Sequence, residues 1–162
     1  MADWDSSDIS APLLRLPYGI LLVGSKDGDQ LNLMTANWGT QCSFEPRLYC
    51  VFVEADSHTR KLIDRGGVFT ICLLPAESEH AVSLYTKPAE VIGDKLGDHE
   101  FFLAPQTGAP VYAGSVAYFE CRVTEARPVG DHIQYTGEVV GGATRTDEPA
   151  WTLQELGWDY GG

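Results

Sequence analysis

Positive charge is scarce in this sequence. Lys and Arg number 11 against 23 Asp and Glu, so the formal net charge is −12 at pH 7. Binding to nucleic acid or to an anionic membrane surface needs clustered positive charge, so the composition argues against both partners. The longest apolar runs, such as residues 19–24 and 71–74, are far shorter than a membrane span.

Motifs for metal binding and for nucleophilic catalysis are also missing. The four cysteines, Cys42, Cys50, Cys72 and Cys121, form no Cys-x-x-Cys pair and have no His at zinc-finger spacing, so we expect no metal site. Their even number leaves a disulfide framework open, but a domain of this size does not need one. The acidic N-terminus also lacks the apolar stretch of a secretory signal. We therefore expect reduced thiols and a cytoplasmic location.

Gly-x-Ser-x-Gly and the glycine-rich motifs of dinucleotide-binding and P-loop proteins are absent as well. The acidic residues are scattered, so no pair of catalytic carboxylates can be argued. If the protein is an enzyme, a bound cofactor supplies its chemistry.

The remaining composition is that of one ordinary globular domain. The chain has 162 residues, of which 44% are hydrophobic and 21% are charged. Both ends are acidic, with a charge of −3 over residues 1–14 and −4 over residues 146–162. We expect a flexible acidic arm over 1–14, a folded domain over 15–145 and an acidic, Trp-containing tail over 146–162, whose aromatic side chains are expected to pack.

Apolar runs and alternating patterns predict six strands separated by turn residues. They cover residues 19–25, 30–36, 48–54, 68–74, 115–126 and 132–140. Two short helices are predicted at 56–67 and 77–85, and residues 86–114, with three prolines, are expected to be irregular. Many strands with only short helices predict a mainly β fold, a six-stranded antiparallel barrel with short flanking helices.

The first candidate site is the polar segment 34–43. It brings together the hydrogen-bonding residues Thr35, Asn37, Thr40, Gln41 and Ser43, with Trp38 and Gly39 between them. Such a lining suits a planar polar ligand with a polyhydroxyl chain. A polar loop with one packing Trp is the alternative interpretation.

The second candidate is the start of the predicted helix at 57–61. Unpaired backbone N–H groups and the positive end of the helix dipole favour a phosphate there, and the segment 57–65 has a local charge of +2. An ordinary capped surface helix is the alternative. The third candidate is His132, which follows a Gly-Asp turn and opens a strand. It could donate to a substrate carbonyl or lie in solvent.

Together these segments resemble one known family, the flavin reductase-like family of FMN-binding split barrels. The resemblance runs from about residue 15 to 141 and rests on the order of its motifs. They are Leu16-Pro17-Tyr18-Gly19, residues 32–38, Gln41-Cys42-Ser43-Phe44-Glu45-Pro46, Ser57-His58-Thr59, residues 67–74, Gly130-Asp131-His132 and Gly137-Glu138-Val139.

The resemblance implies a homodimeric split β-barrel of Greek-key type that holds FMN, less often FAD, near the subunit interface. It implies that residues 35–43 line the flavin, that 57–59 hold its phosphate and that His132 lies near the nicotinamide. The expected cofactor-binding residues are Thr35, Ala36, Asn37, Trp38, Thr40, Gln41, Cys42, Ser43, Glu54, Ser57, His58, Thr59, Arg60 and Lys87.

The implied reaction is hydride transfer from NADH or NADPH to the flavin, which then passes electrons to a partner oxygenase or another acceptor. One alternative is an FMN-binding electron-transfer module, similar to flavoredoxin, without its own nicotinamide activity. A remoter one is a barrel like pyridoxamine-phosphate oxidase, which needs a substrate-phosphate site that the sequence does not locate.

Overall fold

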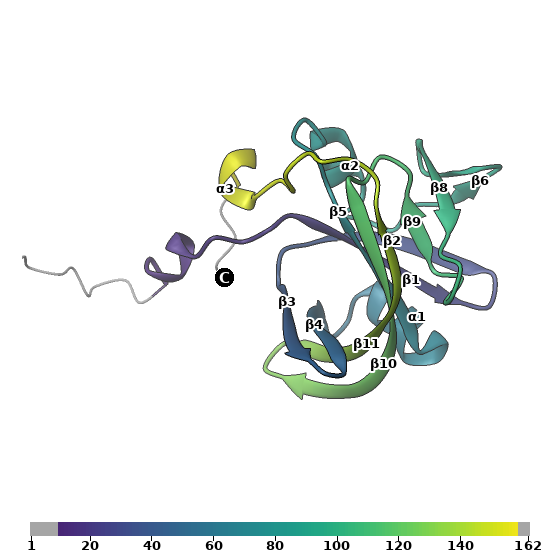
Figure 1. Cartoon of the computed structure of the whole chain (residues 1–162), viewed down its shortest axis with the longest axis horizontal. Coiled ribbons are helices and arrows are strands. Elements are labelled where there is room, and N and C mark those ends of the chain that lie inside the picture. Colours follow the sequence, from purple (N-terminus) through teal and green to yellow (C-terminus); the bar gives the residue numbers. More distant parts are fainter. Residues whose placement is uncertain (1–9, 159–162) are drawn as a thin grey trace, which may run out of the picture.

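Antiparallel β-sheets dominate the structure, a computed structural model that describes residues 10–158. The main sheet has seven strands in the order β2-β1-β5-β10-β11-β4-β3 (Figure 1). Its strands are β1 (Leu21–Asp27), β2 (Gln30–Ala36), β3 (Gly39–Phe44), β4 (Arg47–Glu54), β5 (Val68–Leu73), β10 (Ala117–Val129) and β11 (His132–Thr144).

A smaller four-stranded sheet lies beside the main one. It contains β6 (Val91–Ile92), β7 (Lys95–Leu96), β8 (His99–Leu103) and β9 (Pro110–Tyr112). Four short helical segments complete the described residues: η1 (Leu13–Arg15), α1 (His58–Gly66), α2 (Glu79–Leu84) and α3 (Leu153–Leu156).

The mainly β, antiparallel prediction is confirmed, and the main sheet contains one strand more than the six predicted for the barrel. The missed strand, β3, is an exposed, polar edge strand that pairs only with β4, so it lacks the apolar alternation that marks the others. Residues 86–114, predicted to be irregular, form the small sheet instead. Its strands are too short for a periodic signal and depend on pairing with one another.

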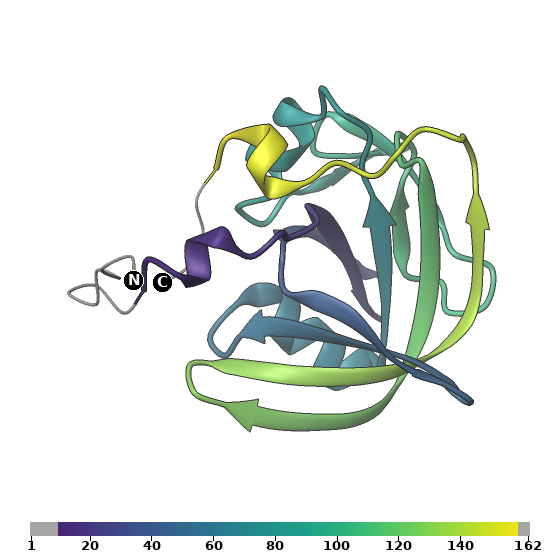
Figure 2. The same ribbon diagram turned by 60° about the vertical axis from the view of Figure 1, so that its left-hand side comes forward.

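Strands β10 and β11 form a long curved ribbon around the rest of the domain (Figure 2). Their pairing register shifts between Glu120 and Cys121 and again between Val123 and Glu125. Such bulges bend a strand and increase its twist. The ribbon thereby brings the start of β11 alongside the end of β4, where His132 pairs with Glu54.

Two hydrophobic clusters cover the two faces of the main sheet. Leu22 of β1 belongs to the cluster with Val82 and Tyr85 of the α2 region, whereas Val23 belongs to the cluster with Phe69 and Tyr135. Because β1 buries both faces, its sequence is a continuous apolar run rather than an alternating one.

The C-terminal segment is built into the core. Trp151 is buried, its N–H donates to the Leu74 carbonyl at 2.8 Å, and its carbonyl accepts from the Ile20 N–H at 3.1 Å. A further bridge pairs Gly19 with Thr152. Helix α3 therefore lies against the start of β1.

Candidate functional site

Two adjoining pockets open where the ends of β2, β4 and β11 meet. One has a volume of about 250 Å³ and the other about 400 Å³. Ligand sites in proteins usually measure about 300–1,000 Å³. Both pockets are lined by Asn37, Trp38, Phe52 and His132.

Each pocket also has walls of its own. The smaller is completed by Ile20, Met34, Thr35, Ala36, Glu54, Thr86, Leu153 and Trp158, and the larger by Tyr18, Gly39, Thr40, Val129 and Asp131.

Strand alternation explains why these side chains meet. On β4, Val51 and Val53 belong to the core, so Phe52 and Glu54 point to the opposite face of the sheet. His132 lies opposite Glu54 across the β4–β11 pairing. Asn37 and Trp38 connect β2 to β3, and the Phe52 N–H donates to the Trp38 carbonyl at 3.0 Å, which ties this connection to β4.

Trp38 and His132 form a ring pair in the wall that both pockets share. Their ring centres are 4.7 Å apart. His132 Nδ1 lies 2.6 Å from Asp131 Oδ1, and this hydrogen bond lowers the pKa of the Asp131 carboxyl. Because Asp131 engages one ring nitrogen, the orientation of the imidazole is fixed and Nε2 is left for a ligand.

The Asn37 amide shows that the pockets fit a ligand with hydrogen-bond acceptors. Asn37 is 9% exposed, and its Nδ2 is buried without a hydrogen-bond partner among the described residues. Leaving a buried donor unpaired costs about 1–3 kcal/mol, so a ligand that accepts from it would be stabilised. A flavin ring carries carbonyl oxygens and ring nitrogens along its edge, which are acceptors for such a donor.

Thr35 contributes to the pocket wall but not with its hydroxyl. Thr35 Oγ1 donates to the Val82 carbonyl at 2.7 Å, and the Thr35 N–H donates to the Tyr85 carbonyl at 3.0 Å. Both bonds fasten the end of β2 to the α2 region. The expectation that this hydroxyl faces a ligand is therefore corrected.

The C-terminal segment supplies a wall that the sequence did not predict. Leu153 is buried and Trp158 is 40% exposed, and both line the smaller pocket. The capping box of α3, made by Thr152 and Glu155, sets this short helix in place. The Trp residues of the tail were the available signal, but only the tertiary contacts of Trp151 show where they lie.

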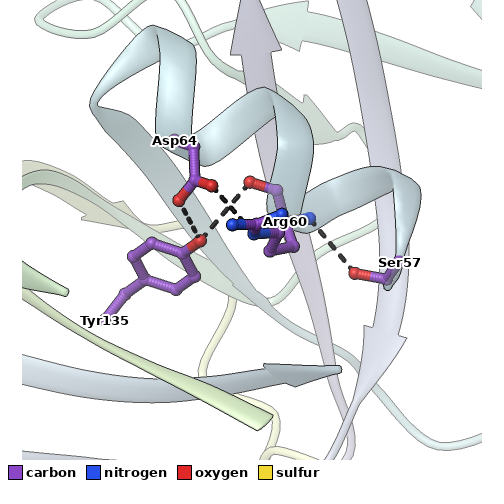
Figure 3. Close-up of polar contacts among 4 residues, drawn as sticks. All are labelled: Ser57, Arg60, Asp64 and Tyr135. Atoms are coloured by element: carbon purple, nitrogen blue, oxygen red, sulfur yellow. Dashed lines mark hydrogen bonds and ion pairs between the residues drawn. The ribbon is translucent and has the colours of Figure 1, made fainter. Parts of the chain in front are cut away.

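Several polar side chains at the start of α1 are bonded to other groups of the protein (Figure 3). Ser57 Oγ caps the helix by accepting from the Arg60 N–H at 3.1 Å. The Arg60 Nε lies 2.8 Å from Asp64 Oδ2, and the Tyr135 hydroxyl donates to Asp64 Oδ1 at 2.5 Å. Burial and the neighbouring Asp64 raise the pKa of Tyr135. The Arg60 charge is thus paired within the protein.

The expectation that the Thr59 side chain binds the phosphate is also corrected. Thr59 is 1% exposed, and its Oγ1 accepts from Asn32 Nδ2 at 2.9 Å, so the hydroxyl faces the interior. The groups left for a phosphate are the first backbone N–H groups of the helix and the side chains of His58 and Lys61.

The structure gathers about half of the predicted site residues, seven of fifteen, around the pockets. Of the four shared residues, Asn37, Trp38 and His132 were predicted and Phe52 was missed, and the pockets also bring in Thr35, Ala36, Thr40 and Glu54 from the predicted set. The helix-start residues form a separate group four residues after Glu54. Lys87 and three residues of β3 do not line either pocket: Gln41, Cys42 and Ser43.

Within residues 10–158, no group of three or more His, Cys, Asp or Glu side chains could hold a metal ion. In the same part of the chain, no helix has the length and apolar character needed to cross a membrane.

Two pockets that share an aromatic wall, on an antiparallel β domain, have a shape and lining suited to a flat polar ligand. The chain belongs to the flavin reductase-like family, because the model of the "Flavin reductase like domain" matches residues 13–157.

Individual relatives carry related names. The chain is 30% identical to an NADH-dependent FAD reductase of Streptomyces globisporus over 83% of its own length and 72% of the relative's. Its structure is similar to that of BorF, the flavin reductase component of a bacterial two-component tryptophan halogenase. The TM-score is 0.78, with 26% identity over 91% of this chain and 92% of BorF.

A longer relative matches only in part. The chain is 29% identical to a putative diflavin flavoprotein of Synechocystis over 79% of its own length, but it spans only 21% of that protein.

Proposed function

We propose that this protein is an NAD(P)H:flavin oxidoreductase that holds FMN in the two joined pockets. The observation that carries the proposal is the buried Asn37 amide, an unpaired donor in the wall shared by both pockets. The family of the chain and the name of its Streptomyces globisporus relative support it. FAD is the second candidate for the flavin.

The pocket residues would each have a defined role. Asn37 Nδ2 donates to an acceptor on the edge of the flavin ring, while Trp38 and Phe52 present apolar surface to its plane and exclude water. His132, oriented by Asp131, presents Nε2 to the nicotinamide carboxamide. When bound, the flavin supplies the hydride-accepting chemistry that no side chain of this protein provides.

The start of α1 would hold the flavin phosphate. Its first N–H groups carry the positive end of the helix dipole, and Lys61 adds a charge that is not engaged by Asp64. Arg60 would serve here as a paired charge beside the site rather than as a direct ligand, because Asp64 occupies its Nε.

We also propose a homodimer with the barrel left open on one side, and delivery of electrons to a separate acceptor. Phe44 at the end of β3 is 85% exposed, and its apolar ring is a side chain that a second subunit would cover. BorF, named as the reductase component of a two-component halogenase, supports a partner oxygenase as acceptor. The four free cysteines fit the proposed cytoplasmic location.

The second candidate is an FMN-binding electron-transfer module without nicotinamide activity. The match to one part of a longer relative that is named as a diflavin flavoprotein, and not as a nicotinamide-dependent reductase, favours it. The two candidates differ in whether a nicotinamide site exists beside the flavin.

Anaerobic stopped-flow mixing tests the proposal and separates the candidates. The protein is loaded with FMN or FAD and mixed with NADH or NADPH, while flavin absorbance is followed. We expect bleaching with at least one donor. A flavin that binds and is bleached by dithionite but by neither nicotinamide establishes the electron-transfer module instead, and a protein that binds no flavin contradicts both candidates.

A further inference from the structure

Cys42 and Cys50 form a thiol pair on the edge of the main sheet. Their Sγ atoms lie 3.1 Å apart across strands β3 and β4, and both are free thiols. A disulfide bond measures about 2.05 Å, so closing it needs a movement of only about 1 Å. The other two cysteines, Cys72 and Cys121, are each fully buried.

The local backbone explains why the two sulfur atoms meet. Thr40 pairs with Cys50 across the strands, but the register shifts between Gln41 and Ser43. Cys42 is therefore the extra residue of a bulge, and bulges redirect side chains. Because β3 is an edge strand with no neighbour beyond it in the main sheet, this residue can move without disturbing other pairings.

The two thiols differ in accessibility, as an oxidation site requires. Cys42 is exposed, so a small oxidant reaches it from solvent. Cys50 is 7% exposed and is held by Thr136 Oγ1 at 3.4 Å and Gln134 Nε2 at 3.5 Å, both on β11. One sulfur is thus available for attack, and the other is positioned to resolve the oxidised product.

We propose that Cys42 and Cys50 form a reversible intramolecular disulfide when the protein meets a peroxide. The Cys42 sulfur attacks hydrogen peroxide, the O–O bond breaks, and a sulfenic acid and one water result. The Cys50 sulfur then displaces the hydroxyl of that acid as a second water, and the S–S bond forms. Both thiol hydrogens leave in the two waters, so the protein loses two electrons and the peroxide gains them.

The bond would act on the face that carries the pockets. Cys50 and Phe52 lie on the same face of β4. Gln134 of β11 donates to Cys50 and is the residue paired with Phe52 in the β4–β11 ladder. Oxidation would therefore tie β3 to the sheet beside the pocket wall, near Thr40. The inference does not depend on the identity of the pocket ligand.

The rate of Cys42 oxidation should depend on pH in a way that distinguishes it from an ordinary cysteine. Desolvation and the adjacent Cys50 raise the pKa of Cys42 to about 11. The thiolate is the reactive form, so oxidation is slow at neutral pH and its rate keeps rising above pH 9, where an ordinary cysteine levels off.

Peptide mapping of the whole protein after treatment with hydrogen peroxide tests the proposal. Trypsin cleaves after Lys26, Arg47 and Arg60, so Cys42 and Cys50 fall on separate peptides, 27–47 and 48–60. We expect these two peptides to be linked, the denatured protein to titrate two thiols instead of four, and dithiothreitol to restore all four. Cys72 and Cys121 serve as internal controls that remain thiols.

Two variants keep the result interpretable. Cys42→Ser should retain its three thiols under the same treatment, whereas Thr40→Ser, a neighbouring substitution that leaves both thiols, should oxidise like the original protein. Peroxide treatment that leaves four thiols, links two chains to each other, or adds oxygen to Cys42 without joining the peptides overturns the proposal.

Discussion

The indole of Trp38 and the imidazole of His132 face each other at 4.7 Å with their planes inclined by 45°. The two residues are far apart in the sequence, and the curved β10–β11 ribbon brings them together. The pair stands in the wall common to both pockets, with Asp131 holding the far side of the imidazole at 2.6 Å. His132 is thereby a wall residue of both pockets.

Replacement of His132 should separate nicotinamide use from flavin binding. In His132→Ala we expect kcat/KM for the nicotinamide donor to fall about 10–100-fold, because one oriented hydrogen bond is worth about 1.5–3 kcal/mol. The Kd for FMN should change by less than about 3-fold. Asp131→Asn, which keeps the ring but weakens its orientation, should give a smaller loss. Equal losses in both measurements would assign His132 a structural role.

Replacement of Asn37 should weaken ligand binding without weakening the fold. Its Nδ2 has no partner among the described residues, so Asn37→Ala removes no intramolecular bond of that donor. We expect the Kd for FMN, measured by calorimetry, to rise about 10-fold, which corresponds to about 1.4 kcal/mol. The free energy of unfolding should fall by less than about 1 kcal/mol. A folded variant with a clearly lower unfolding free energy but an unchanged Kd for FMN would contradict the assigned role.

Trp158 should contribute to flavin affinity from the rim of the smaller pocket. Its side chain is 40% exposed, so a ligand that covers it gains apolar contact. We expect Trp158→Ala to raise the Kd for FMN about 5–10-fold and Trp158→Phe to restore much of the affinity. Ile92→Ala, an exposed apolar residue of β6 that lines neither pocket, is the matched control. Identical FMN binding in Trp158→Ala and the control would remove Trp158 from the site.

Acid should destabilise the protein partly through His99. Burial and the nearby His80, whose Nδ1 lies 2.9 Å from His99 Nε2, lower the pKa of His99 below its usual 6.5. The unfolded chain then binds this proton more readily than the folded one, so stability present above pH 6.5 is lost as the pH falls through the folded-state pKa.

Urea unfolding at pH 7.5 and pH 5 measures this loss. We expect the unfolding free energy to fall more in the original protein than in His99→Gln, whose side chain does not titrate. The comparison cancels the contribution of carboxylates elsewhere. A larger loss in His99→Gln than in the original protein would show the opposite sign.

The six predicted strands and two predicted helices could be located because each carries its own signal. Strand β10 alternates apolar and polar residues, and α1 has a serine cap and a glycine at its end, where Gly67 adopts φ +67°. Strand β3 could not be predicted in this way. Its residues are polar, and it is held in place by β4 rather than by burial of its own side chains.

The sequence indicated several residues that line the pockets, but it did not indicate which of their polar atoms are available to a ligand. Asn37, Trp38 and His132 all line the pockets, because segments rich in polar and aromatic residues mark a binding surface. The hydroxyls of Thr35 and Thr59 follow the same pattern in the sequence, yet they bond to the Val82 carbonyl and to Asn32. Only the tertiary structure shows which polar side chains already have a hydrogen-bond partner within the protein.

The wall of Asn37, Trp38, Phe52 and His132 belongs to both pockets, so ligands in the two pockets would contact the same side chains. A ligand that shifts Trp38 or His132 in one pocket changes the surface offered in the other. Whatever factor the first ligand applies to the affinity of the second, the second must apply equally to the first. In the flavin-free protein, the affinity of a small ligand for one pocket, measured with and without a small ligand in the other, would give the sign of this coupling.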